Sequence, residues 1–177
     1  MRKINFLLLI GFASIALKPA TSIYSINIQK LDGSTVNLGS FSGKKMIIIE
    51  FDAGNYDKSQ LKLLDSLQKA NAGAIVIGVP AKDFGTAPNV QTVKNIATTL
   101  NLSLIITQPV FVKRSAGGNQ HPLFKWLTNV SENTHFNYDA DQPGQIFMVS
   151  EKGELYALLY KAVTSNTLKE AASQKTK

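Results

Sequence analysis

Two almost continuous apolar runs, with an amphipathic segment between them, limit the folds open to this chain more than any other feature. The first run covers residues 46–51 and is interrupted only by Glu50, and the second covers residues 74–79. Such runs are typical of strands in a sheet that is covered on both faces. Residues 58–70 carry leucines at helical spacing, with lysines and glutamines on the other side, which predicts an amphipathic helix. Together the three segments predict a right-handed βαβ unit.

The segments on either side of this unit extend the pattern. Before it, alternating residues around an Asp32-Gly33 pair predict a β-hairpin. After it, we expect a weaker helix over 89–100, an extended piece from 108, a short helix over 122–130, a hairpin over 145–160 and a last helix from Thr164 or Ser165 to about 172. A βαβ unit followed by ββα is the thioredoxin arrangement. We therefore expect an α/β fold with a mixed central sheet, helices on both faces and an N-terminal β-hairpin extension.

Residues 1–22 have the layout of a secretory signal peptide. A basic start precedes the apolar run 4–17, and small residues around Ala20 follow it. The run is shorter than the ~20 residues that span a bilayer, although an uncleaved membrane anchor stays open as an alternative. We expect residues 23–177 to form one exported domain, periplasmic or secreted, which meets the membrane only transiently through the signal peptide.

The sequence holds no cysteine, and this excludes a class of chemistry. A thiolate is the nucleophile of thiol peroxidases and disulfide exchangers, and no other side chain readily replaces it. The two histidines, His121 and His135, make a weak case for zinc without a third ligand, and we expect neither a metal nor a cofactor. The net charge of +7 falls once residues 1–22 are removed, and export disfavours nucleic acid as a partner.

Four motifs in order resemble the glutathione peroxidase family. Residues 41–45, before the first apolar run, resemble the stretch that precedes the family's peroxidatic cysteine, and residues 77–85 are similar to its G-F-P-C-N-Q-F-G motif. Residues 108–111 resemble its F-P-V-F segment. Residues 121–127 read HPLFKWL and match its H-P-L-[FY]-K-[FW]-L element almost letter for letter. The resemblance extends over roughly residues 23–172 and implies the thioredoxin-like fold of that family.

The same resemblance places the family's catalytic positions on residues of different chemistry. The peroxidatic cysteine or selenocysteine falls on Tyr56, the resolving-type cysteine on Ala81, and the active-site glutamine on Asp83. The Trp-Asn pair of the family should precede the strand at Ile146, where residues 139–144 supply neither residue type. A phenol does not attack a peroxide bond as a thiolate does. The resemblance therefore implies a scaffold without its catalytic residues.

Three hypotheses about function follow. The leading one is a binding module that takes a protein or peptide partner at the former active-site face, around Tyr56, Phe84 and Pro143, where exposed aromatic side chains suit such a ligand. The alternatives are a family peroxidase with a cysteine-free mechanism and a structural envelope protein. Many thioredoxin-fold proteins place a cis-proline opposite the active-site loop, and the Gln142-Pro143 bond is a candidate for it.

Acidic residues near the same edge invite a cation-site hypothesis. Asp52, Asp57 and Asp83 follow the carboxyl ends of neighbouring expected strands, where ligands bind in open α/β sheets. Their carboxylates could hold Ca²⁺, but the favoured interpretation is that they cap turns and helix starts. Residues 137–141 alternate oxygen ligands without the glycine and glutamate of an EF-hand, so we interpret them as a surface loop. We expect His121 to cap or pack the short helix.

Overall fold

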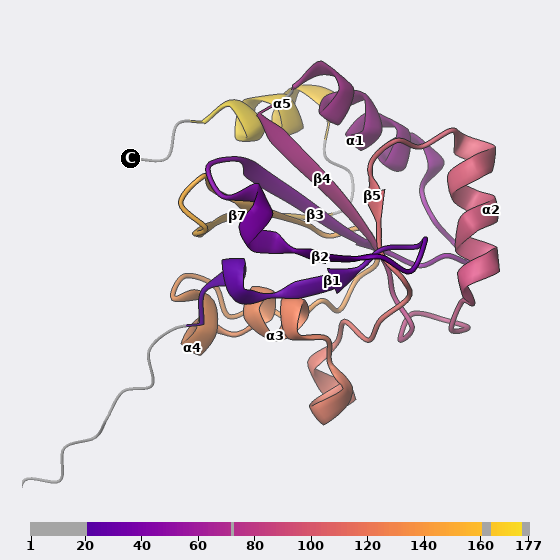
Figure 1. Ribbon diagram of the computed structural model, residues 1–177, viewed down its shortest axis with the longest axis horizontal. Coiled ribbons are helices and arrows are strands. Elements are labelled where there is room, and N and C mark those ends of the chain that lie inside the picture. The colour runs from indigo at the N-terminus through magenta and orange to yellow at the C-terminus, as the bar shows by residue number, and fades with distance from the viewer. Residues whose placement is uncertain (1–20, 72, 161–163, 175–177) are drawn as a thin grey trace, which may run out of the picture.

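The computed structural model describes residues 21–71, 73–160 and 164–174 (Figure 1). The central element is a five-stranded sheet in the order β5-β4-β3-β6-β7. Its strands are β3 (Lys45–Phe51), β4 (Ala74–Pro80), β5 (Ile105–Ile106), β6 (Ile146–Val149) and β7 (Leu155–Leu159). β3, β4 and β5 run parallel, whereas β6 is antiparallel to β3 and β7 is antiparallel to β6. This is the mixed sheet that the order of elements predicted.

Helices cover both faces of the sheet (Figure 1). Their bounds are α1 (Lys58–Ala70), α2 (Val90–Leu100), α3 (Pro122–Thr128), α4 (Val130–Asn133) and α5 (Ser165–Ser173), with short 3₁₀ helices η1 (Ile23–Ser25), η2 (Leu38–Phe41) and η3 (Arg114–Asn119). The expected helices at 58–70, 89–100 and 164–172 are confirmed. Asp57, Asn89 and Thr164 cap their first turns with side-chain oxygens.

The central strand β3 separates two hydrophobic cores. Ile47 and Ile49 point into a core shared with α1, α2 and α5, whereas Met46 and Ile48 point into a core shared with α3 and the N-terminal segment. Because successive side chains of a strand point to opposite faces, a strand buried on both faces needs an unbroken apolar run. Every residue of β3 is buried, which explains the run that marked it in the sequence.

The N-terminal hairpin forms as predicted. β1 (Asn27–Gln29) pairs antiparallel with β2 (Thr35–Asn37), and the two form a separate sheet. The turn between them contains Gly33 with φ of +91°, a conformation that glycine adopts without steric cost. Ile26 and Ile28 extend from this segment into the core beside α3. The hairpin therefore covers one face of the sheet.

Two boundaries differ from the expectations. The short helix expected over 122–130 is divided, because Asn129 is extended, with φ of −110° and ψ of 121°, between α3 and α4. The edge strand β5 precedes the extended piece expected from 108. The residues directly after β5 make only isolated bridges, such as that of Val110 with Ala81. Pro109 lacks the N–H that would continue a ladder.

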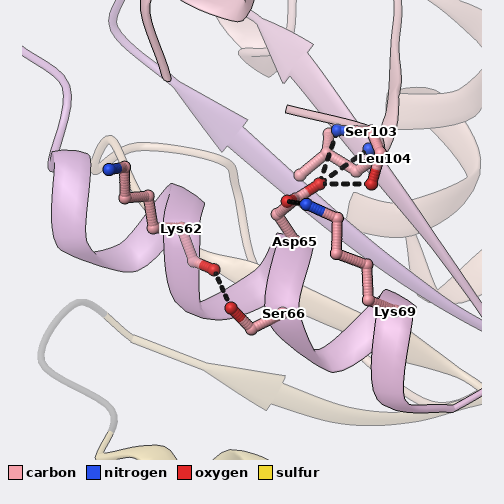
Figure 2. A network of polar contacts seen from close by, with 6 residues as sticks. All are labelled: Lys62, Asp65, Ser66, Lys69, Ser103 and Leu104. Carbon is pink, nitrogen blue, oxygen red and sulfur yellow. Dashed lines mark hydrogen bonds and ion pairs between the residues drawn. The ribbon is translucent and has the colours of Figure 1, made fainter. Parts of the chain in front are cut away.

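A buried carboxylate attaches α1 to the chain that leads into β5 (Figure 2). Asp65 accepts hydrogen bonds from the backbone N–H groups of Ser103, at 2.6 Å, and Leu104, at 3.0 Å. Its second oxygen forms an ion pair of 2.6 Å with Lys69. Burial alone raises the pKa of Asp65, but the ion pair and the hydrogen bonds outweigh it and lower the pKa below its ordinary value.

The proposed signal peptide concerns residues 1–22, of which residues 1–20 lie outside the described part of the chain. Among the helices that the structure describes, none combines the length and the apolar character needed to cross a membrane. The interpretation of residues 1–22 therefore stays a prediction from sequence.

Candidate functional site

The corner to which the resemblance assigns the catalytic positions lies where β3 and β4 end. Asp52 follows β3 and accepts a 2.8 Å hydrogen bond from the N–H of Gly54, which closes a turn. Asp57 accepts from the N–H groups of Ser59 and Gln60, at 2.9 and 3.1 Å, at the start of α1. Both carboxylates thus have the turn and capping roles that the sequence favoured.

Tyr56 stands at the position that the resemblance gives to the catalytic thiol. Its side chain is half-buried and packs against the core beneath α1. Together with Pro143 it lines a cavity of only about 10 Å³, which also contacts Asp52, Gln60 and Gly144. A volume of this size holds about one water molecule. We call these five residues the closed corner, because no ligand larger than water fits inside it.

The turn into β6 forms the other wall of the closed corner. The described residues contain no cis peptide bond, so the Gln142-Pro143 bond is trans and the cis-proline prediction is wrong. Gly144 makes the turn with φ of +93°. Its carbonyl accepts a 3.0 Å hydrogen bond from Nε2 of Gln60 on α1. The glycine therefore supplies the unusual backbone geometry at this point.

Ala81 and Asp83 have structural roles. Ala81, at the position of the resolving-type cysteine, is fully buried, and its N–H donates to the carbonyl of Phe51 at 2.9 Å. The carboxylate of Asp83 accepts from the N–H groups of Val112, at 3.0 Å, and Lys113, at 2.7 Å. Asp83 thus holds the segment after β5 through these hydrogen bonds. Within the described residues, no three His, Cys, Asp or Glu side chains are placed to hold a metal ion.

Phe84 does not offer an exposed aromatic surface. The prediction that it contributes to a ligand face is corrected by its burial, since the side chain is only 5% exposed and belongs to the core beside α3. The ammonium of Lys113 lies 4.4 Å from the centre of the Phe84 ring. Because Asp83 fixes the backbone of Lys113, the same contact that holds the segment also places a cation over the ring.

Glu50 is the residue of this region that the sequence interpretation overlooked. It is fully buried in β3, and its two carboxylate oxygens accept from the N–H groups of Gly144, at 3.0 Å, and Gln145, at 3.1 Å. Burial raises the pKa of Glu50 well above its ordinary value, and the two hydrogen bonds offset only part of that effect. The signal was present in the sequence as a single acid inside an apolar strand.

The remaining candidates are structural as well. His121 caps α3, since its Nδ1 accepts from the N–H of Leu123 at 3.2 Å, as expected. His135 is exposed in a loop. Residues 137–141 form the predicted surface loop, and its Asp139 accepts a 2.9 Å hydrogen bond from the N–H of Arg114.

The chemistry that this corner can perform is narrow. A thiol peroxidase needs a thiolate and nearby groups that stabilise it, and the corner presents a phenol at Tyr56 and carboxylates that accept backbone hydrogen bonds. The carboxylate of Asp83 is an acceptor, whereas the amide that the resemblance places there has donors. The geometry thus matches the loss of the catalytic residues.

Comparisons with known proteins agree with this scaffold. The profile of the family described as glutathione peroxidase matches residues 23–128. The hydroperoxy fatty acid reductase of Synechocystis sp. is 33% identical over 115 residues, which cover 62% of this chain and 66%, just under two thirds, of that relative. The crystal structure of T. cruzi GPX1 superposes with a TM-score of 0.66 at 15% identity, over 86% of this chain and 94% of that one.

A second solved structure shows how widely the fold is shared. A thiol:disulfide interchange protein of the thioredoxin family from Chlorobium tepidum superposes with a TM-score of 0.64 at 14% identity, over 88% of this chain and 95% of that one. At such identities the likeness concerns the fold alone, and it confirms the thioredoxin-like architecture. Since the family profile covers more than half of the sequence, the chain belongs to the glutathione peroxidase family.

Proposed function

We propose that this protein is a glutathione peroxidase-like binding protein that does not turn over hydroperoxides. The observation that carries the proposal is the replacement of the family's thiol positions by Tyr56 and Ala81 in a chain without cysteine. Reduction of a hydroperoxide, the activity named for the Synechocystis relative, needs a nucleophile that accepts the peroxide oxygen. This chain offers no thiol for that step.

The proposed binding surface is the outer side of the closed corner. Tyr56 and Pro143 are half-buried there, and Gly54 and Asn55 beside them are exposed. Because the cavity beneath holds only about one water molecule, we propose a protein or peptide that lies across the surface. Tyrosine, which combines an apolar ring with a polar hydroxyl, is a frequent contact residue in such interfaces.

The proposal includes export to the periplasm or the medium after removal of residues 1–22, which carry the layout of a secretory signal. In that compartment the partner would be another envelope or secreted protein.

Hydroperoxide consumption tests the catalytic part of the proposal. We expect the purified protein to consume no peroxide above the buffer rate, with either glutathione or a thioredoxin system as reductant. The variant Tyr56→Cys serves as the matched comparison, since it places one thiol at the family position. We expect that thiol to be oxidised once per chain without sustained turnover, because Asp83 stands where the family has glutamine. Turnover by the unchanged protein that survives metal removal and repurification would favour the cysteine-free peroxidase.

Crosslinking in the producing cells tests the binding part. We expect Tyr56→Ala to abolish a defined crosslinked adduct that the unchanged protein forms. The control is Tyr138→Ala, which removes a tyrosine that is 56% exposed and does not line the closed corner. Equal adducts from both variants would contradict a partner at this face and favour the structural envelope protein.

A further inference from the structure

A second and much larger cavity lies on the opposite face of the sheet from the closed corner. Its volume is about 260 Å³, and its walls come from β1, the end of β4, the segment after β5 and the start of α3. The lining residues are Ile28, Gln29, Val79, Lys82, Thr107, Gln108, Pro109, Val110, His121 and Leu123. We call it the hairpin cavity, because β1 of the N-terminal hairpin forms one wall, close to α3 (Figure 1). It shares no lining residue with the closed corner.

The floor of the hairpin cavity is apolar and consists of buried core side chains. Ile28, Val79 and Leu123 are each only 1% exposed and belong to the same hydrophobic core. They come from β1, β4 and α3, three elements that meet in this core. The volume lies just below the ~300–1,000 Å³ typical of sites for small organic ligands. The cavity is therefore suited to a compact ligand with an apolar body.

Lys82 carries the one permanent charge among the residues that line the hairpin cavity. Lys82 and His121 are among its lining residues, and none of the ten is an aspartate or a glutamate. No carboxylate forms an ion pair with Lys82 within the described part of the chain. Its ammonium lies 5.6 Å from the centre of the Phe111 ring, an aromatic side chain that is 36% exposed. An aromatic face positions a cation but leaves its charge available to an anion.

His121 adds a hydrogen-bond donor beside this charge. Its Nδ1 accepts from the N–H of Leu123, so the neutral imidazole carries its proton on Nε2. Burial lowers the pKa of His121, which keeps the ring neutral at physiological pH. Among the residues that the structure describes, Nε2 donates to no partner. The cavity thus combines one unpaired ammonium, one free N–H donor and an apolar floor.

We propose that the hairpin cavity binds a small amphipathic monocarboxylate, with its apolar body on Ile28, Val79 and Leu123 and its carboxylate at Lys82 and His121. An ammonium and an N–H donor satisfy the two oxygens of a carboxylate with charge-assisted hydrogen bonds. Binding is also favoured because the apolar tail leaves water when it packs on the apolar floor. This site is independent of the proposed partner surface at Tyr56, and its test does not depend on the result there.

Binding of hexanoate, measured by calorimetry and by amide NMR, tests the proposal. We expect saturable binding in the micromolar to low-millimolar range, with the largest shifts at the amides of Val79 and Leu123. Acetate has the carboxylate without the tail, and 1-hexanol has the tail without the carboxylate. We expect each of them to bind at least about tenfold more weakly than hexanoate, which corresponds to the loss of about 1.4 kcal/mol.

Two variants locate the carboxylate and the tail. Lys82→Met keeps the length of the side chain but removes its charge, and we expect it to weaken hexanoate binding at least about tenfold while 1-hexanol binds as before. Val110→Trp fills the cavity and should abolish the binding of both ligands. Lys113→Met is the matched control, since Lys113 also lies over an aromatic ring but does not line the cavity.

Several outcomes would overturn the proposal. The absence of saturable hexanoate binding excludes the site. Equal affinity of Lys82→Met and the unchanged protein shows that the carboxylate lies elsewhere. If 1-hexanol binds as tightly as hexanoate, the cavity takes neutral apolar molecules and the carboxylate assignment is wrong. If circular dichroism shows that Val110→Trp does not fold, the hexanoate affinities of Lys82→Met and Lys113→Met still decide whether the carboxylate binds at Lys82.

Discussion

At the scale of single residues, the positions that would carry catalysis in the family hold the fold together. Asp83 fixes the backbone of Val112 and Lys113, and Ala81 is packed into the core. A side chain whose hydrogen-bonding capacity is used by the backbone has little left for a substrate. The contacts of Ala81 and Asp83 are therefore structural ones near the strand ends.

Glu50 gives the first prediction at this scale. Because burial raises its pKa, the folded protein holds the proton more tightly than the unfolded chain does. Its contribution to stability is therefore greatest below the ordinary pKa of 4.5 and falls as the pH rises toward the raised folded-state value. We expect Glu50→Gln to remove this slope, which amounts to up to about 1.4 kcal/mol per pH unit inside that window.

Urea unfolding checks this expectation. The free energy of unfolding of Glu50→Gln and of the unchanged protein is measured at about every pH unit between about pH 4 and 8. Glu154→Gln is the control, because it removes the same charge from an exposed position next to β7. Parallel pH profiles for Glu50→Gln and the unchanged protein would show that Glu50 titrates normally.

At the scale of elements, α1 is held both by its apolar face and by one polar contact. Leu61 and Leu64 pack into the core beneath α1, and Asp65 connects the helix to the chain before β5 (Figure 2). The apolar contacts fix the face of the helix, and the carboxylate fixes its position along the neighbouring segment. Periodicity predicted the apolar contacts. It could not predict the polar contact, because Ser103, the partner of Asp65, is 38 residues away in sequence.

Replacing Asp65 by alanine should destabilise the protein by about 2–3 kcal/mol, because two backbone N–H groups then lose their charged acceptor. Since the pKa of Asp65 is lowered in the fold, its contribution is present above the ordinary value of 3.8 and is lost as the pH falls through the lowered value. Urea unfolding at neutral and at acidic pH measures both effects.

The matched variant for this element is Lys69→Met, which removes only the partly exposed ion-pair partner. We expect it to cost less than about 1 kcal/mol. A loss as large as that of Asp65→Ala would assign the stabilisation to the ion pair and not to the backbone hydrogen bonds.

At the scale of the whole molecule, the two hydrophobic cores share the sheet and should unfold together. Trp126, the only tryptophan, lies in the core beside α3 and reports on that face. Leu64 is fully buried on the other face. We expect Leu64→Ala to cost about 3 kcal/mol and to shift the urea midpoint of Trp126 fluorescence together with that of far-UV circular dichroism.

The control for this prediction is Leu63→Ala on the same helix, whose side chain is only partly buried and should cause a smaller shift. A fluorescence midpoint that stays in place while the circular dichroism midpoint moves would mean that the two faces unfold separately.

The sequence by itself determined the order of elements and the loss of thiol chemistry. Periodicity and capping residues act within a few positions of one another, so local rules could predict the bounds of α1 and a cap at Thr164 or Ser165, of which the structure uses Thr164. The composition alone likewise shows that the sequence contains no cysteine. A family motif such as HPLFKWL needed no structure to be recognised.

Only the tertiary structure decided which side chains remain accessible. Phe84 is buried because it packs into the core beside α3, and the closed corner is narrow where Tyr56 and Pro143 line the same small cavity. The hairpin cavity arises where β1, the end of β4 and α3 meet. Each of these outcomes depends on contacts between segments far apart in the chain, and the volume left between such segments follows from packing and not from any local pattern.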